Sequence, residues 1–219
     1  MKIGILVAMD KEFDRLKAAV GESGKIGNNT IVLAKSGMGK VNAAVKAVEM
    51  IKSEAPDCLI STGVAGGLGE NVDTMDVVVS RQVAYHDVWC GEGEYGQVQG
   101  LPARFDCNKA LCEATATIDA APSKLHCGLI ASGDQFISER EQEEKILSNF
   151  PDALAVDMES GALAHTCYLY KLPFISFRII SDTLRGENRY SDYENFWENV
   201  GDTSFTVIKK FLESLPESL

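Results

Sequence analysis

An acidic residue ends the most apolar strand-like stretch of the sequence. The run Phe174–Ile180 follows Leu172-Pro173 and closes in Ser181-Asp182. An acid at the carboxyl end of a buried strand lies where open α/β sheets bind ligands. Partial burial there would raise the pKa of Asp182, so that it could hold a proton near neutral pH and give it to a leaving group. A helix cap or the start of a turn would explain the same Ser-Asp pair.

Two further acids stand at predicted helix starts. Glu12 falls in the first turn of a helix, where the helix dipole favours the ionised carboxylate, so it could act as a base toward water. An exposed carboxylate at a helix start is the alternative. Glu159 begins an apolar helix, and such a carboxylate at a cleft could accept hydrogen bonds from the vicinal hydroxyls of a ribose. Its alternative is a buried ion pair, for which Arg178 is the natural partner.

Other chemistries lack their motifs. The glycine turn Gly63–Gly67 has neither the G-x-G-x-x-G order of a dinucleotide site nor the Lys-Ser/Thr of a phosphate loop. There is no G-x-S-x-G elbow, and the three histidines read as structural. The six cysteines form no C-x-x-C pair, and no His lies at metal-site spacing from them, so they read as reduced and buried. The sequence therefore predicts no metal site.

Strand-like and helix-like segments alternate along the chain, which predicts an α/β fold in one domain over residues 1–219, with a central mixed sheet flanked by helices on both faces. Expected strands are 3–8, 31–34, 58–60, 76–80, 82–85, 127–132, 154–156 and 173–181. Expected helices are 10–20, 39–51, 108–118, 138–148, 158–170 and 192–215. Residues 87–104 are expected to form a long loop.

Charge and length exclude other partners. The formal net charge of -11 argues against a general nucleic-acid binder and against docking on anionic membranes. The apolar run Ile3–Ala8 is too short for a signal peptide or a membrane span, and it leads directly into a charged helix. We therefore expect a cytoplasmic protein, while the net charge says nothing about a small-molecule ligand, which sees local charge only.

Seven short motifs occur in order along the chain. They are Ala8-Met9-x-x-Glu12, Ser36-Gly37-Met38-Gly39-Lys40-Val41, Thr62-Gly63-x-Ala65-Gly66-Gly67, Tyr85-His86-Asp87, Ser132-Gly133-Asp134-x-Phe136-Ile137, Asp157-Met158-Glu159 and Arg178-x-x-Ser181-Asp182. Together they resemble the nucleoside phosphorylase and nucleosidase superfamily, and within it most of all the methylthioadenosine/S-adenosylhomocysteine nucleosidases. The resemblance runs nearly from end to end. It implies hydrolysis of the N-glycosidic bond of these two nucleosides, with no metal or organic cofactor, by a homodimer.

The resemblance also implies residue roles. Asp182 would be the general acid that protonates N7 of adenine, and Glu12 the base that activates water. Glu159, with Met158 and Arg178 nearby, would hold the ribose hydroxyls. The other binding residues it implies are Gly66 at the ribosyl site, Ser181 beside the acid, Phe136 stacked on adenine, the backbone of Ile137 at the adenine edge, and Met9, Met38 and either Tyr193 or Phe196 around the sulfur substituent. The 87–104 loop would complete that last pocket across the dimer interface.

The chain departs from the family pattern in three places. Val64 stands where these nucleosidases usually carry Ser, Asp157 replaces a usual Glu, and the 87–104 loop is shorter and carries Trp89-Cys90. Phosphorylase relatives bind phosphate with Arg and a hydroxyl near the glycine turn, which here has no Arg, so hydrolysis is favoured. A hydrolase of futalosine or AMP, a phosphorylase and a non-catalytic nucleoside-binding protein remain alternatives.

Overall fold

The strands of the fold run together into one sheet. The computed structural model describes residues 1–21, 24–183, 185, 189–199 and 203–219. Over these residues nine strands pair: β1 Lys2–Val7, β2 Lys25–Ile26, β3 Asn29–Lys35, β4 Cys58–Gly67, β5 Val77–Tyr85, β6 Arg104–Asp106, β7 Leu125–Ser132, β8 Ala153–Asp157 and β9 Phe174–Thr183. The hydrogen-bonded order is β2-β3-β1-β4-β8-β7-β5-β6, and β9 pairs with both β4 and β5. Parallel and antiparallel pairs both occur, so the predicted mixed sheet is confirmed.

Five of these strands close on themselves. β4, β9, β5, β7 and β8 pair in a ring, because β9 bridges β4 and β5 while β8 bridges β7 and β4. β1, β4 and β9 are parallel, so their carboxyl ends meet at one edge. The antiparallel pairing of Val156 with Gly66 brings the carboxyl end of β8 to the same place. This closure gathers several strand ends around one point of the molecule.

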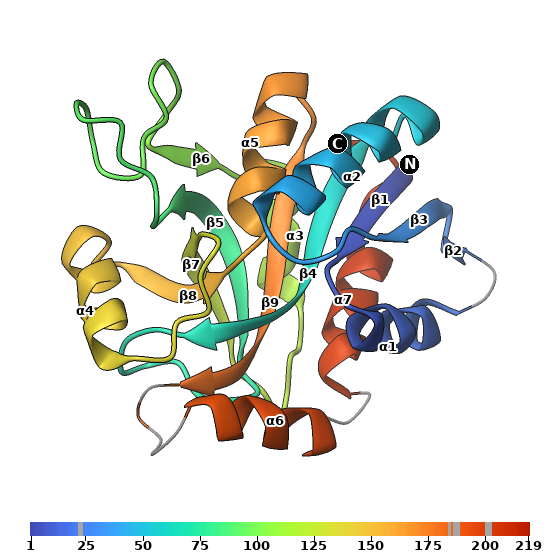
Figure 1. Cartoon of the computed structure of the whole chain (residues 1–219). Helices are drawn as coiled ribbons and strands as arrows, with labels where there is room; N and C mark the ends of the chain where they lie inside the picture. Colours follow the sequence, from blue (N-terminus) through green and yellow to red (C-terminus); the bar gives the residue numbers. More distant parts are fainter. Residues whose placement is uncertain (22–23, 184, 186–188, 200–202) are drawn as a thin grey trace.

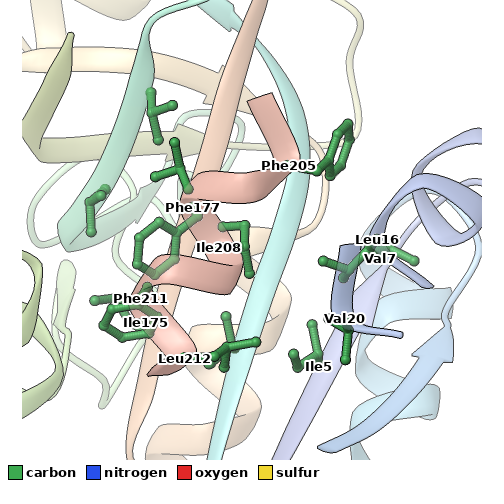
Figure 2. Close-up of a cluster of buried hydrophobic side chains, with 14 of the residues drawn as sticks. Ile5, Val7, Leu16, Val20, Ile175, Phe177, Phe205, Ile208, Phe211 and Leu212 are labelled. Atoms are coloured by element: carbon green, nitrogen blue, oxygen red, sulfur yellow. The ribbon is translucent and has the colours of Figure 1, made fainter. Parts of the chain in front are cut away.

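Helices cover both faces of the sheet, as predicted (Figure 1). Their bounds are α1 Asp10–Val20, α2 Lys40–Glu54, α3 Lys109–Ala114, α4 Arg140–Asn149, α5 Ser160–Tyr170, α6 Arg189–Asn199 and α7 Thr203–Ser214. Side chains alternate along the strands, so Ile5 and Ile175 pack in a cluster with α1 and α7 while Leu6 and Phe174 pack with α2 and α5. Figure 2 shows the first cluster, in which Phe177 lies 4.6 Å from Phe211 between ring centroids.

Three element predictions were wrong in part. The glycine turn at 63–67 is the end of β4, because β9 pairs along it as far as Gly67. The single helix over 192–215 is replaced by α6 and α7. The helix over 108–118 is shorter, since α3 ends at Ala114 and a 3₁₀ turn follows over Thr115–Thr117.

Pairing between β4 and β9 shifts by one residue near its end. Ala65 pairs with Ile180, and the next residue, Gly66, pairs with Asp182. Ser181 is therefore the extra residue of a β-bulge, a feature that bends a strand and re-aims its side chains. Ser181 and Asp182 both face the cavity described below.

Candidate active site

A cavity of about 270 Å³ lies where the strand ends converge. Its lining comes from the end of β1 and the start of α1, from β4, β8 and β9, from the loop after β7, and from α6. The lining residues are Ala8, Met9, Glu12, Met38, Val64, Ala65, Gly66, Gln135, Phe136, Ile137, Val156, Asp157, Met158, Glu159, Ser181, Asp182, Tyr190 and Tyr193. Every site residue expected from the sequence is among them except Arg178 and Phe196.

Main-chain amides hold the carboxylate of Glu12. One oxygen accepts the N–H of Val64 at 2.9 Å, and the other accepts the N–H groups of Ala8 and Met9, each at 2.9 Å. A side chain at Gly63 would overlap the first oxygen, so only glycine permits this approach of α1 to β4. Burial raises the pKa of Glu12, while the three N–H groups and the charge of Arg178 oppose that rise.

A buried ion pair lies directly behind the cavity. The Nε of Arg178 donates to Oδ2 of Asp157 at 2.6 Å, and its Nη2 donates to the hydroxyl of Ser61 at 2.8 Å. Asp157 also accepts from the hydroxyl and the N–H of Ser160. The expected ion pair of Arg178 with Glu159 is therefore wrong: Asp157, at the end of β8, is the direct partner. Arg178 is only 2% exposed, and acts on the cavity through its charge.

Glu159 occupies the N-cap position of α5, with its carboxylate in the cavity. Its Oε1 accepts the N–H of Gly39 at 2.8 Å, at the start of α2. Burial, reinforced by the neighbouring charge of Asp157, raises the pKa of Glu159 to about 7, although Arg178 and the Gly39 N–H pull it down. Glu159 is therefore able to change its charge near neutral pH.

Asp182 and Ser181 face the cavity from the bulge in β9. The hydroxyl of Ser181 lies 2.5 Å from Oδ2 of Asp182 and 3.2 Å from the carbonyl oxygen of Ala65. Asp182 is 2% exposed. With Glu12, Asp157 and Glu159 it forms a set of four buried acids, which we call the polar floor.

The cavity lining also includes large apolar and aromatic side chains. We call Met9, Met38, Phe136, Tyr190 and Tyr193 the apolar mouth. The ring of Phe136 makes edge contacts with Tyr190 and Tyr193, at centroid distances of 6.3 and 5.8 Å, and the Tyr193 hydroxyl donates to the sulfur of Met9 at 3.5 Å. Of the two expected walls, Tyr193 lines the cavity, whereas Phe196 packs in the core against Trp197.

Sequence reasoning missed the structural roles of some residues. From the sequence, Asp157 is expected only as a residue that replaces a usual Glu. Its position two residues before Glu159 makes it a second possible ion-pair partner of Arg178. Tyr190 gave no signal, because its place depends on how α6 crosses the cavity. Gln135 also lines the cavity, although the motif that contains it assigned it no role.

The 87–104 loop lies apart from the cavity of its own chain. None of the described residues that line the cavity comes from it. Trp89 stacks on Tyr95 at 6.3 Å between centroids, and remains 56% exposed. The irregular segment ends at Arg104, where β6 begins.

The described ranges contain neither a candidate metal cluster nor a candidate membrane span. No group of three or more His, Cys, Asp or Glu side chains there is arranged to hold a metal ion. No described helix combines the length and apolarity needed to cross a membrane.

Comparison with known proteins agrees with the fold. The family model for the phosphorylase superfamily matches residues 2–213, which defines the class of protein. The 5'-methylthioadenosine/S-adenosylhomocysteine nucleosidase of Staphylococcus carnosus is 36% identical, over 97% of this chain and 100% of its own length. The chain belongs to this nucleosidase family within the phosphorylase superfamily.

Solved structures give the same result. The S-adenosylhomocysteine nucleosidase of Streptococcus pyogenes, in complex with 5-methylthiotubericidin, superposes with a TM-score of 0.90 at 30% identity, covering 99% of this chain and 98% of the other. A mutant of the futalosine hydrolase of Helicobacter pylori is also similar, with a TM-score of 0.89 at 27% identity, covering 98% and 100%. The shared fold therefore extends across nucleosidases named for different substrates.

Proposed function

We propose that the chain hydrolyses the N-glycosidic bond of methylthioadenosine and S-adenosylhomocysteine, releasing adenine and a thioribose. Asp182 is the general acid and Glu12 the general base for water. Glu159 and Met158 hold the ribose, Gly66 and Ser181 line its site, and Phe136 with the backbone of Ile137 receives adenine. The observation that carries the proposal is the polar floor, four buried acids lining one cavity together with one apolar wall.

The polar floor suits a dissociative cleavage. When the bond between C1' and N9 breaks, its electrons go to the purine, and positive charge develops on the sugar. Asp182 gives its proton to N7, which neutralises the leaving base. Carboxylates near the sugar stabilise its developing charge. Water then adds at C1' and loses its proton to Glu12, a division of labour like that of paired carboxylates in glycoside hydrolysis.

Hydrogen bonds from Ser181 support the placement of Asp182. The Ser181 hydroxyl donates to Oδ2 of Asp182 at 2.5 Å and lies 3.2 Å from the carbonyl oxygen of Ala65. The carboxyl group is thereby tied to the bulge of β9 on the side that faces the cavity, where a proton donor to the leaving base is needed.

Water suits the cavity better than phosphate as the nucleophile. A phosphate dianion needs cationic and hydroxyl donors. None of the described lining residues is Lys or Arg, and Arg178 is engaged behind the floor with Asp157. The same argument disfavours AMP, whose phosphate would meet the same uncompensated acids. Futalosine, the substrate class named for one structural relative, remains the alternative substrate.

We also propose a homodimer in the cytoplasm. Exposed apolar side chains gather on α2 and α5, which pack against each other: Val41 and Val45 on α2, and Tyr168 and Leu169 on α5. Large apolar side chains left exposed on two packed helices are a feature that association sites share. The free cysteines fit a reducing compartment. Sedimentation equilibrium should give a dimer mass, and a monomer at micromolar concentration would contradict the proposed assembly.

The function is tested with the purified protein and a panel of nucleosides in phosphate-free buffer. We expect adenine release from methylthioadenosine and S-adenosylhomocysteine, with a rate that added phosphate leaves within twofold. Strict dependence on phosphate would make the protein a phosphorylase. Faster release from futalosine than from either thio-nucleoside would change the substrate, and binding without release would favour a non-catalytic role.

A further inference from the structure

Parts of three sequence motifs have no role in the chemistry proposed above. They are the segment Ser36–Val41, the end of β5 at Tyr85–Asp87, and the start of the loop after β7 at Ser132–Asp134. These segments are far apart in sequence, yet one residue from each meets the other two in the structure. Those residues are Lys40, Asp87 and Asp134.

Their hydrogen bonds form a closed cycle. The ammonium group of Lys40 donates to Oδ2 of Asp87 at 2.7 Å, and the same oxygen accepts the backbone N–H of Asp134 at 2.9 Å. The side chain of Asp134 in turn accepts the backbone N–H of Lys40 at 2.7 Å. The ammonium group also lies 5.4 Å from the ring centre of Tyr85, a cation–π contact. Each member is therefore bonded to the other two, and loss of one of these bonds opens the cycle.

One side of the cycle leads to the ribose end of the cavity. Gly39 precedes Lys40, and its N–H donates to the carboxylate of Glu159 at 2.8 Å. Gly39 has a φ of +89°, and a side chain there would stand 3.0 Å from Oδ1 of Asp134. The close approach of Asp134 to the start of α2 is therefore tied to the backbone that orients Glu159.

The other side leads to the base end. Asp134 is followed immediately by Gln135, Phe136 and Ile137, all of which line the cavity. Asp134 is held at both its N–H and its side chain, so the loop begins from a fixed point. The loop start also makes a bond from the N–H of Gly133 to the carbonyl of Asp157 at 3.0 Å and one from the N–H of Gln135 to the carbonyl of Gly133 at 2.8 Å, and neither of these reaches α2. The cycle is thus the anchor of the loop to α2.

We propose that Lys40, Asp87 and Asp134 form a positioning clamp, which holds the base-binding loop and the Glu159 carboxylate in one fixed relation. The clamp rests on the proposed function for its role, since it serves the two ends of the same nucleoside site. Its members touch the reacting atoms only through other residues. Without the clamp, both ends must be ordered when the substrate binds, which weakens binding.

The test compares Lys40→Met and Asp87→Asn with Lys46→Met. Lys46 lies on the same helix and pairs with Glu49 on the surface, so its substitution removes an ion pair of the same kind away from the cavity. We expect the two clamp variants to raise KM for methylthioadenosine about tenfold, with a smaller fall in kcat, and to weaken adenine binding measured by calorimetry. Lys46→Met should stay within twofold of wild type, and Lys40→Arg, which keeps the charge, should restore much of the affinity.

Hydrogen exchange of the free protein gives a second readout that needs no activity. Amide exchange over residues 133–137 and 38–40 should accelerate in both clamp variants and remain unchanged in Lys46→Met. Two results would overturn the clamp. One is unchanged amide exchange over these residues in the clamp variants, and the other is a wild-type KM and adenine affinity with only kcat reduced. If the wild type cleaves no nucleoside, the proposed function fails, while the exchange experiment still decides whether the three residues anchor the loop.

Discussion

The polar floor and the apolar mouth of the cavity are built by different means. The floor acids are nearly inaccessible, with Glu12 and Asp182 each 2% exposed, whereas Met38 and Tyr190 in the mouth are 60% and 57% exposed. Floor carboxylates are held by backbone N–H groups, a buried arginine and hydroxyls. Mouth side chains are held by edge contacts between rings and one weak bond to sulfur.

Under the proposed function, the difference assigns the reaction to the floor and selectivity to the mouth. Backbone donors cannot rotate away, so they fix the charges of the floor before a substrate arrives, as electrostatic stabilisation of a transition state requires. Apolar contacts of exposed side chains are weaker and less directional, so they can adapt to different substituents. Relatives named for different substrates share this fold, which is consistent with selectivity that resides outside the floor.

The largest effect should come from the proton donor. Asp182→Asn keeps the shape but removes the acidic proton, and we expect kcat for methylthioadenosine to fall about 10³-fold, within the usual range for a lost general acid. Adenine binding should persist, because the amide can still contact the base. Asp119→Asn, at a surface acid paired with Lys210, is the matched control. A wild-type kcat in the first variant would remove Asp182 from the mechanism.

The base should come next. Each carboxylate oxygen of Glu12 accepts at least one main-chain N–H. In Glu12→Gln, the NH₂ group therefore faces an N–H donor in either orientation of the amide. We expect kcat to fall about 10²-fold and stability to fall by about 1–3 kcal/mol, the cost of an unsatisfied buried donor. Single-turnover kinetics and urea unfolding measure the two effects. Glu54→Gln, a partly exposed acid near Lys2, should change neither. Stability loss without loss of turnover would make Glu12 structural.

The sequence predicted the elements that position the floor because their patterns are local. The uniform apolar run of β9 and the start of α1 at Asp10 could be found from composition and spacing alone. The glycines of β4 were taken for a turn, since glycine usually marks one. The actual reason is spatial: Gly63 admits the carboxylate of Glu12, and a side chain at Gly67 would crowd Ile180 and Thr183.

Other features depended on contacts between distant segments. Asp157 and Glu159 flank Met158, and nothing in their order indicates which acid takes Arg178. Asp157 is the partner of Arg178 because β8 ends beside β4, and this neighbourhood is a consequence of the ring of strands. The last segment was predicted as one helix over 192–215, whereas the structure has α6 and α7 there.

Protonation of Glu159 should be visible in stability. Its pKa is raised to about 7 in the folded chain from an ordinary 4.5, so the stability this group contributes is present below pH 4.5 and is lost as pH rises through 7. Glu159→Gln removes the titration and resembles the protonated acid. We expect the variant to match wild type at pH 5 and to exceed it at pH 8 by up to about 3 kcal/mol in urea unfolding. An equal difference at both values would mean that Glu159 does not titrate in this range.

The smallest effect should come from the mouth, and it separates the two walls expected from the sequence. Tyr193→Ala removes a ring that lines the cavity and contacts Phe136, so KM for methylthioadenosine should rise about tenfold, equivalent to about 1.4 kcal/mol, with kcat within threefold. Phe196→Leu, one turn of α6 away and 4% exposed, should leave KM within twofold while lowering Tm by a few degrees, because it changes only core packing. Steady-state kinetics and thermal unfolding of the two variants measure these effects.

Two outcomes would show that mouth and floor are not independent. One is a larger rise in KM from Phe196→Leu than from Tyr193→Ala, and the other is a fall in kcat with Tyr193→Ala as large as that of a floor variant. The first outcome would place the thio-substituent deeper than the cavity suggests, and the second would give α6 a part in catalysis.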